Sequence, residues 1–399
     1  MNGAKMLNIP STDRIAAVAD TWSVEIRRDD DAFASLASEW NELYSRCSTA
    51  TPFQSYAWLE SWWREYGVPG RLRLALVRKG GRLVGAAPLM VQRRGPWLVL
   101  SPLGQGLSDF TEILLDDGWA AEARLELASA LLADPGWQVG DFHEARPGGA
   151  TRCLYDGWPG ARWQVPGSVC LEVPAGSLDE LLGKLPRRPS QRIRNRLRKI
   201  DEHGLTVRRV AVAGVEEAVA RLLRLHEQQW QGRGVNQEHL RPRFARHLVR
   251  AASSMVEQGQ AAVFEHRIGE RVVAVDVAVV GPGFIGAYIA GVDPSLRDQV
   301  DVATLLLRPA MELAEQRGRP VVSMLRGEEP YKMRWHPVPV RNERLLVGRP
   351  GRSPAAAAYA VAVRARAAAV DALRRRLPWL REARRRARQT TARLAGRGR

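Results

Sequence analysis

The clearest pattern of apolar and polar positions lies in residues 261–335, where runs of period two are followed by a run of helical period. Glycine-containing turns at 268–270 and 281–283 separate segments rich in β-branched residues, as in an antiparallel meander. A meander followed by a helix and one more strand predicts an α+β layer rather than a βαβ array. The predicted elements are strands over 261–267, 272–280, 284–291 and 321–325, and a helix with Val302, Leu305, Leu306, Ala310 and Leu313 on one face that ends at Gly318.

A similar pattern lies earlier in the chain, in residues 22–168. Residues 78–87 align with residues 267–276, because each copy has a strand end, a glycine turn, an arginine and a strand of small or β-branched residues. Two helices with aromatic side chains precede each copy, so the shared order predicts a duplication and two lobes. The expected elements of the first copy are helices that begin at Asp31 and span 56–66 and 119–132, and strands over 72–77, 83–91, 97–101, 111–115 and 139–144.

The second copy begins near Val169 and contains a strongly basic segment. A short helix over 177–185 stops at Pro186, and Ser190 is expected to cap a basic helix that Gly204 ends. Such a run is most often a solvated helix face, although it could also contact an acidic acceptor, RNA or lipid headgroups. A strand over 205–212 and helices over 216–230 and 243–257 are expected to follow.

The positive charge of the chain is concentrated at its C-terminal end. Residues 349–399 contain fifteen arginines against Asp371 and Glu382, a net +13 out of +17 for all 399 residues. The body of the chain therefore has an ordinary balance of charge, and its 45% apolar content is ample for packed cores. Residues 349–399 are expected to be an Ala/Arg-rich basic tail with helix propensity over 355–376, able to contact RNA or an anionic membrane surface.

Three widely spaced cysteines, Cys47, Cys153 and Cys170, predict neither a disulfide framework nor a metal cluster. We therefore expect no metal and a reducing, cytoplasmic location, with peripheral attachment at the inner face of the membrane as an option for the tail. No run of about twenty apolar residues predicts a transmembrane helix. Residues 1–21 lack the apolar core of a secretory signal and are expected to be a flexible lead-in.

Three segments of the second copy resemble a known family: the run Ala290-Gly291-Val292-Asp293-Pro294, the helix over 305–318, and residues 325–335. They are similar to the CelD-like group of GNAT-related acyltransferases, which are relatives of the Fem-type peptidyltransferases, and the resemblance covers roughly residues 22–346. It implies an α+β fold with two tandem GNAT-like lobes and mixed, mostly antiparallel sheets. The implied domains are 22–168 and 169–348, followed by the basic tail 349–399.

The resemblance also implies an acyl-CoA donor, with acetyl-CoA as co-substrate. In GNAT-like folds the fourth strand of a lobe and the following helix hold the acyl carrier, which here implies the strand over 284–291 and a helix that starts near 298–302. Gly291, Arg297 and Gln299 are the resulting cofactor-binding candidates. The run 297–303 lacks the usual glycines and contains two aspartates, whereas the first-copy run 103–109 is richer in glycine, as many simple turns are.

Two residues are candidates for the proton transfers that acyl transfer from a thioester requires. Asp276 is a lone carboxylate in a valine-rich strand, where burial would raise its pKa and suit it to act as a general base. Tyr288, on the next strand, could protonate the leaving thiolate. The structural alternatives are a hydrogen-bonded aspartate and a tyrosine of the core.

Two clusters are candidates for substrate binding. The first follows the closing strand and consists of Arg326, Glu328, Tyr331 and Lys332, which could hold an anionic group or form a salt-bridged turn. The second lies at the end of the helix over 216–230 and consists of His226, Trp230 and Arg233, which a packed tryptophan and a surface histidine would explain nearly as well.

The function predicted from these residues and the resemblance is transfer of an acetyl group from acetyl-CoA to an amine or hydroxyl of a sugar or cell-envelope polysaccharide precursor. One alternative is Fem-type aminoacyl transfer from charged tRNA. Another is a non-catalytic GNAT-like scaffold whose basic tail recruits partners.

Overall fold

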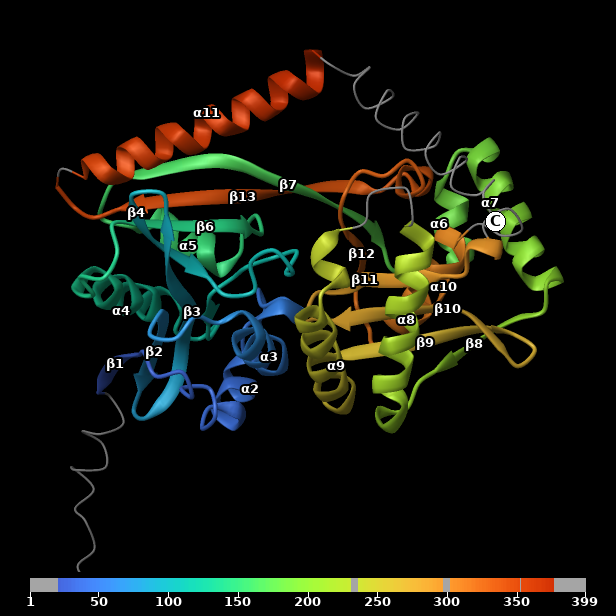
Figure 1. Cartoon of the computed structure of the whole chain (residues 1–399), viewed down its shortest axis with the longest axis horizontal. Helices are drawn as coiled ribbons and strands as arrows, with labels where there is room; N and C mark the ends of the chain where they lie inside the picture. Colours follow the sequence, from blue (N-terminus) through green and yellow to red (C-terminus); the bar gives the residue numbers. More distant parts are fainter. Residues whose placement is uncertain (1–20, 231–235, 297–301, 352, 377–399) are drawn as a thin grey trace, which may run out of the picture.

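The structure is a computed structural model that describes residues 21–230, 236–296, 302–351 and 353–376 (Figure 1). The described residues form one continuous sheet that crosses the whole molecule. Its strands are β1 (Trp22–Arg27), β2 (Leu72–Lys79), β3 (Arg82–Arg94), β4 (Trp97–Pro102), β5 (Leu114–Leu115), β6 (Val139–Ala145), β7 (Arg162–Pro174), β8 (Leu205–Arg209), β9 (Ala261–Ile268), β10 (Arg271–Val280), β11 (Phe284–Val292), β12 (Val321–Arg326) and β13 (Val338–Gly348). Its helices are α2 (Ala37–Ser45), α3 (Tyr56–Tyr66), α4 (Ala120–Ala133), α5 (Ala150–Asp156), α6 (Leu178–Lys184), α7 (Arg187–Glu202), α8 (Val215–Trp230), α9 (Pro242–Glu257), α10 (Val302–Gln316) and α11 (Pro354–Arg376).

The two lobes complete each other's sheets. The strand order is β1-β2-β3-β4-β6-β13-β7-β12-β11-β10-β9-β8, so β6 of the first lobe pairs with β13 from the end of the second. Reciprocally, β12 pairs with β7, the last strand of the first lobe. The expected boundary between residues 168 and 169 falls inside β7, because this one strand serves both lobes.

The predicted α+β class with two lobes is confirmed, as is the mixed, mostly antiparallel sheet. Two pairs among the described strands are parallel, β4 with β6 and β11 with β12, and they occupy corresponding places in the two lobes. Helices α4 and α10 make the respective connections between these strands. The chain therefore repeats one topology twice.

The register of the hairpins shows the duplication residue by residue. In β2–β3, Ala75 lies opposite Ala87, and in β9–β10, Phe264 lies opposite Asp276. Two residues closer to the turn, on the same face of the sheet, the pairs are Val77 with Gly85 and His266 with Ala274. Both ladders then shift by one residue on the second strand. Because the registers and the bulges coincide, Val77 and Ala87 occupy the first-lobe positions of His266 and Asp276.

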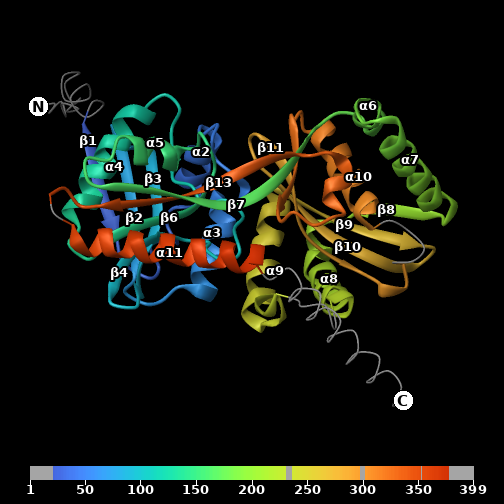
Figure 2. The ribbon, with the colours of Figure 1, turned by 90° about the horizontal axis from the view of Figure 1, so that it is seen from above.

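The largest core lies between the lobes, on one face of the sheet. Helices α2 and α3 of the first lobe and α8 and α9 of the second contribute to it, and Ser61 of α3 donates a hydrogen bond to the carbonyl of His247 on α9 at 3.0 Å. The other face is covered by α4 and α5 in the first lobe and by α6, α7 and α10 in the second (Figures 1 and 2). Burial of large apolar side chains from both lobes in one core makes them a single folded unit.

Part of the expected basic tail is integrated into the fold. The first turns of α11 bury Ala356, Tyr359, Ala360 and Val363 against β4, β6, β7 and β13. The hydroxyl of Tyr359 also donates a hydrogen bond to Asp141 at 2.6 Å. The prediction of a tail over all of 349–399 was therefore wrong for this segment, because small and aromatic residues among the arginines give the helix one face that packs.

Two predicted helix starts were also wrong. The segment from Asp31 to Ser35 forms turns, and α2 begins only at Ala37. The basic helix α7 begins at Arg187, so Ser190 lies inside it and does not cap it. Pro189 is tolerated in the first turn of α7, because the backbone N–H groups of a first turn have no partner within the helix.

Candidate active site

A cavity of about 440 Å³ opens where β11 and β12 separate. The two strands pair only over 284–286 and 321–323, and beyond these residues no ladder joins them. The cavity is lined on one side of the sheet by Leu307 and Trp335, which belong to the core under α10. On the other side it is lined by Leu107 and Tyr288, which belong to the core between the lobes. The cavity therefore passes through the sheet.

A β-bulge in β11 directs Tyr288 towards the first lobe. Val277 lies opposite Ile289 and Ala278 lies opposite Ala287, so Tyr288 is an extra residue in the ladder. This places Tyr288 on the same face as Ile289, where regular alternation would have put it on the opposite face. Its hydroxyl donates a hydrogen bond to the carbonyl of Leu107 at 3.2 Å. Burial raises the pKa of Tyr288, so the hydroxyl keeps its proton at neutral pH.

Asp276 lines the same cavity from β10 and pairs with a histidine. The Nε2 atom of His266 lies 2.6 Å from the Asp276 carboxylate, and both side chains are buried. Burial raises the pKa of the Asp276 carboxyl, and the hydrogen bond from His266 offsets only part of this increase. Nδ1 of His266 has no hydrogen-bond partner among the described residues, so Asp276 is the one hydrogen-bond partner of this imidazole there.

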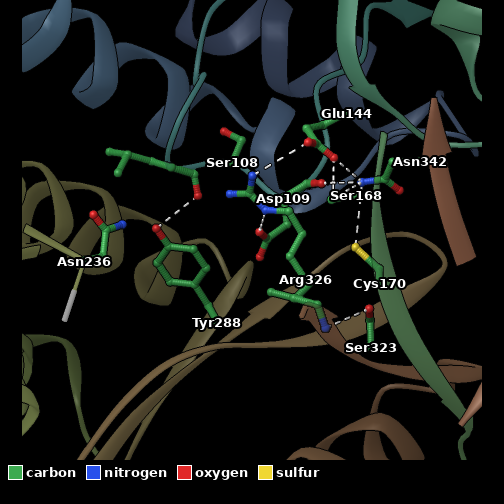
Figure 3. A network of polar contacts seen from close by, with 12 residues as sticks. Ser108, Asp109, Glu144, Ser168, Cys170, Asn236, Tyr288, Ser323, Arg326 and Asn342 are labelled. Carbon is green, nitrogen blue, oxygen red and sulfur yellow. Dashed lines mark hydrogen bonds and ion pairs between the residues drawn. The ribbon is translucent and has the colours of Figure 1, made fainter. Parts of the chain in front are cut away.

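Arg326 joins the two lobes at the end of β12. It forms an ion pair with Asp109 of the first lobe, and its guanidinium lies 3.9 Å from Glu144 (Figure 3). Lys332 donates a hydrogen bond to the Arg326 carbonyl at 2.7 Å and pairs with Glu329 at 3.0 Å. Arg326, Lys332 and Glu329 all line the cavity, which gives it a polar end opposite its apolar wall.

A buried polar cluster holds this end of the cavity in place. The side-chain amide of Asn342 donates to the backbone oxygen of Asp109 at 2.9 Å and to Glu144 at 2.8 Å. Ser168 also donates to Glu144 (Figure 3). Asn342 is on β13 and Ser168 is on β7, the two strands that join the sheets of the lobes. These two strands therefore fix the position of Glu144.

A pair of histidines lies beside the cavity. His226 Nδ1 lies 2.8 Å from the carbonyl oxygen of Ala290, and His226 Nε2 lies 3.3 Å from Nδ1 of His239. Nε2 of His239 lies 3.2 Å from the side-chain amide of Asn236. If both histidines are neutral and protonated on Nδ1, every hydrogen bond of this series has one donor and one acceptor. Burial, together with the neighbouring His226, lowers the pKa of His239 to about 4, so the pair is uncharged at neutral pH.

The first-lobe run 103–109 reaches this cavity instead of a site in its own lobe. Gly104 and Gly106 have φ angles of +81° and +86°, which favour glycine. They turn the chain after β4 so that Leu107 and Asp109 line the second-lobe cavity. The positive φ angles explain both glycines, and Gly106 also lines the cavity.

The remaining predicted residues are placed as follows. Gly291 does not line the cavity, and a Cβ there would lie 2.1 Å from the Leu222 carbonyl of α8, so close packing explains the glycine. Tyr331 lines the cavity, whereas Glu328 is exposed outside it and Glu329 faces the cavity in its place. His226 reaches the cavity only through His239. Arg233, Arg297, Gln299 and the side chain of Trp230 lie outside the described residues.

Sequence reasoning missed Asp109, His239 and His266. Asp109 and His239 are far from the second-lobe strands in sequence, and no local pattern connects them with Tyr288. His266 had a usable signal, because it lies on the same strand face as the residue opposite Asp276. Within the described ranges, no group of three or more His, Cys, Asp or Glu side chains could hold a metal ion. The described helices include none long and apolar enough to cross a membrane.

Comparison with known proteins identifies the second lobe. Residues 187–333 match the family described as "Acetyltransferase (GNAT) domain", so this part of the chain is a GNAT domain. The cavity, Asp276 and Tyr288 all lie in or at this domain. No curated protein matches the sequence. The finer resemblance to the CelD-like group stays a prediction.

Solved structures with TM-scores of 0.50 or more share the fold of this chain. FemX has a TM-score of 0.56 at 12% identity, covering 77% of this chain and 95% of its own. The C-terminal domain (DUF2156) of a putative lysylphosphatidylglycerol synthetase from Agrobacterium fabrum has a TM-score of 0.50 at 12% identity, covering 82% and 95%. A tandem GNAT protein from the clavulanic acid biosynthesis pathway has a TM-score of 0.40 at 13% identity, covering 83% and 99%. At these identities the similarity of the first two shows a common fold alone.

Proposed function

We propose that this chain is an acyltransferase that moves an acetyl group from acetyl-CoA to an amine or hydroxyl of a sugar or cell-envelope polysaccharide precursor. One observation supports this most directly. An acid with a raised pKa and a tyrosine that keeps its proton line one cavity, at the point where two parallel strands of the GNAT domain separate.

The chemistry follows from the protonation of these two side chains. The acceptor nitrogen or oxygen attacks the thioester carbonyl and transfers its proton to the Asp276 carboxylate. The carbon–sulfur bond then breaks, and the Tyr288 hydroxyl protonates the departing thiolate. His266 holds the Asp276 carboxylate by its hydrogen bond and so acts as a positioning residue. The carboxylate form of Asp276 is the active one, so activity rises with pH through its pKa.

The donor would enter between β11 and β12. The edge of β11 beyond Gly286 is not paired with β12, so the backbone groups between Gly286 and Ala290, whose carbonyl faces His226, would pair with an extended acyl carrier. Leu306 and Leu307 of α10 line the same opening. Arg297 and Gln299 remain the predicted contacts for the phosphates of the donor. Gly291 is no longer needed in this role, since packing against α8 accounts for it.

The acceptor would bind at the polar end of the cavity. Arg326 and Lys332 supply positive charge there, Glu329 supplies negative charge, and Tyr331 lies at the rim. Such a set of alternating donors and acceptors suits a hydroxyl-rich or amino-bearing molecule. Asp109 and Glu144 hold Arg326, so its position depends on the first lobe.

The test is calorimetric titration of the protein with acetyl-CoA at low salt, beside the Arg297→Ala variant. Saturable binding that the variant weakens supports a thioester donor. Release of free thiol is then measured with a panel of amino sugars, for the wild type and for Tyr288→Phe. Absence of any acetyl-CoA binding would overturn the proposal.

A second candidate is Fem-type aminoacyl transfer from charged tRNA. The observation that favours it is the basic face of α7, where Arg187, Arg188, Arg192 and Lys199 pair with no acidic side chain of the described residues. Helix α7 contacts α10 through the Asp201–Arg308 ion pair at 2.9 Å, so this face lies beside the donor opening. Titration with charged tRNA, in the presence and absence of acetyl-CoA, separates the two candidates.

A further inference from the structure

A groove of about 820 Å³ lies between α11 and the middle of β7 and β13. Figure 2 shows α11 running alongside these two strands. The groove shares no lining residue with the cavity described above. The first turns of α11 are packed on the first lobe through Tyr359 and its neighbours, whereas the described side chains that follow Val363, residues 364–372, are exposed. The groove therefore lies beside the second half of α11, whose described side chains do not pack on the sheet, whereas the first half of the helix does.

The lining of this groove is amphipathic. Val165 and Pro166 of β7, and Val363, Ala367 and Val370 of α11, contribute apolar surface. Four arginines also line it. No aromatic side chain is present among the described lining residues, so stacking on nucleic acid bases has no support here.

Three of the four arginines are available for a ligand. Arg341, Arg364 and Arg366 are exposed and pair with no acidic side chain among the described residues. The fourth, Arg344, is held by Asp141 at 2.6 Å. Asp371 is the one carboxylate of the described lining, so the groove has a net positive charge. A guanidinium group matches the geometry of a phosphate.

We propose that this groove binds an anionic phospholipid, with the phosphate held by Arg341, Arg364 and Arg366 and the start of an acyl chain on the apolar lining. The charge of the three arginines is complementary to the headgroup, and the apolar residues beside them match the adjoining hydrocarbon. This site attaches the protein to the surface of an anionic membrane through α11. It is independent of the acyl transfer proposed above, since the two sites have no residue in common.

The experiment is co-sedimentation of the full chain with vesicles of phosphatidylcholine, with and without phosphatidylglycerol. Each arginine near an anionic surface contributes about 5-fold in binding, so the triple variant R341A/R364A/R366A is expected to bind roughly 100-fold more weakly. The matched control is R187A/R188A/R192A on α7, which removes the same charge outside the groove and is expected to bind as the wild type does. All six side chains are exposed, so thermal unfolding should be unchanged.

Several results would overturn the proposal. Equal losses in the two triple variants would mean a general attraction of positive charge, and unchanged binding of R341A/R364A/R366A would place the contact elsewhere in the chain. Displacement from vesicles by millimolar glycerol phosphate would make the groove a site for soluble phosphates. Binding of tRNA that only the groove variant loses would make it an RNA surface.

Discussion

The two lobes share a topology but differ at the positions that matter for chemistry. His266 and Asp276 of the second lobe are replaced by Val77 and Ala87 at the same ladder positions of the first. The strands that follow also differ: β4 ends at Pro102, whereas β11 continues through the Tyr288 bulge to Val292. Both lobes therefore have the same scaffold, but only the second has the candidate proton-transfer groups among the described residues.

The first lobe contributes in another way. The chain that leaves β4 forms part of the wall of the second-lobe cavity, with Leu107 and Asp109 in contact with Tyr288 and Arg326. Glu144 and Leu325 lie within corresponding bulges of β6 and β12, and both have left-handed backbones with φ of 58° and 55°. In the first lobe this position presents a carboxylate to the seam between the lobes. Under the proposed function, the second lobe would supply the reacting groups and the first lobe would position them.

The largest expected effect is on catalysis. Asp276→Asn retains an oxygen that accepts the hydrogen bond from His266 but loses the base, so kcat should fall by about 1,000-fold with little change in KM. Steady-state kinetics with the acetyl donor measure this. Glu112→Gln is the control, because Glu112 is a buried first-lobe carboxyl outside the cavity whose pKa burial raises to about 7. A loss of stability with unchanged kcat would leave Asp276 a purely structural role.

The reverse substitution tests the first lobe. Ala87→Asp places a carboxyl at a fully buried position opposite Ala75, with Val77 in the place of the missing histidine. We expect the free energy of unfolding to fall by about 4 kcal/mol, because the new group has no partner. Urea denaturation measures the change. The double variant Val77→His/Ala87→Asp should regain part of the loss, and no recovery would show that the two hairpins are not equivalent in packing.

The interface between the lobes should respond to acid through His247. This histidine is fully buried on α9 beside Trp58 and Ser61, and burial lowers its pKa to about 3. Its pKa when unfolded is about 6.5, so the unfolded state binds the proton first as pH falls. Stability is complete above pH 6.5 and decreases towards pH 3, by about 3 kcal/mol at pH 4.

Denaturation at several pH values measures this contribution as a slope. His247→Gln should remove that part of the slope while other titrating groups, such as Glu112, keep theirs. If the wild type and the variant had the same slope between pH 4 and pH 6.5, His247 would not be the group that links the stability of the interface to acid.

A smaller loss of stability is expected from a substitution near the end of β11, in the part that has no counterpart in β4. A Cβ at Gly291 would meet the Leu222 carbonyl at 2.1 Å and the His226 amide at 2.7 Å. Gly291→Ala should therefore push α8 away and destabilise the protein by about 2 kcal/mol. Gly183→Ala, in helix α6 with nothing within 4 Å, is the control and should be slightly stabilising. Thermal unfolding of both variants distinguishes close packing from a general effect of the added methyl group.

Much of the second lobe was predictable, because its signals are local. The alternation in residues 261–291 and the helical spacing after Val302 correctly predicted β9, β10, β11 and α10. Asp276 was recognisable as the one acid in a valine-rich strand, and the glycine turns of the two hairpins revealed the duplication. Errors arose where a local rule competed with another: Ser190 has the chemistry of a helix cap, but α7 had already begun after Pro186.

The sequence by itself determined the elements, the duplicated hairpin and the concentration of positive charge near the C-terminal end, because each depends on residues that are close together in the chain. Only the tertiary structure decided that β7 and β13 change places, that Leu107 and Asp109 meet Tyr288 and Arg326, and that α11 packs on the first lobe. Those contacts join residues far apart in sequence. The pairing of β7 and β13 between the lobes forms because a strand edge of either lobe would otherwise stay unpaired.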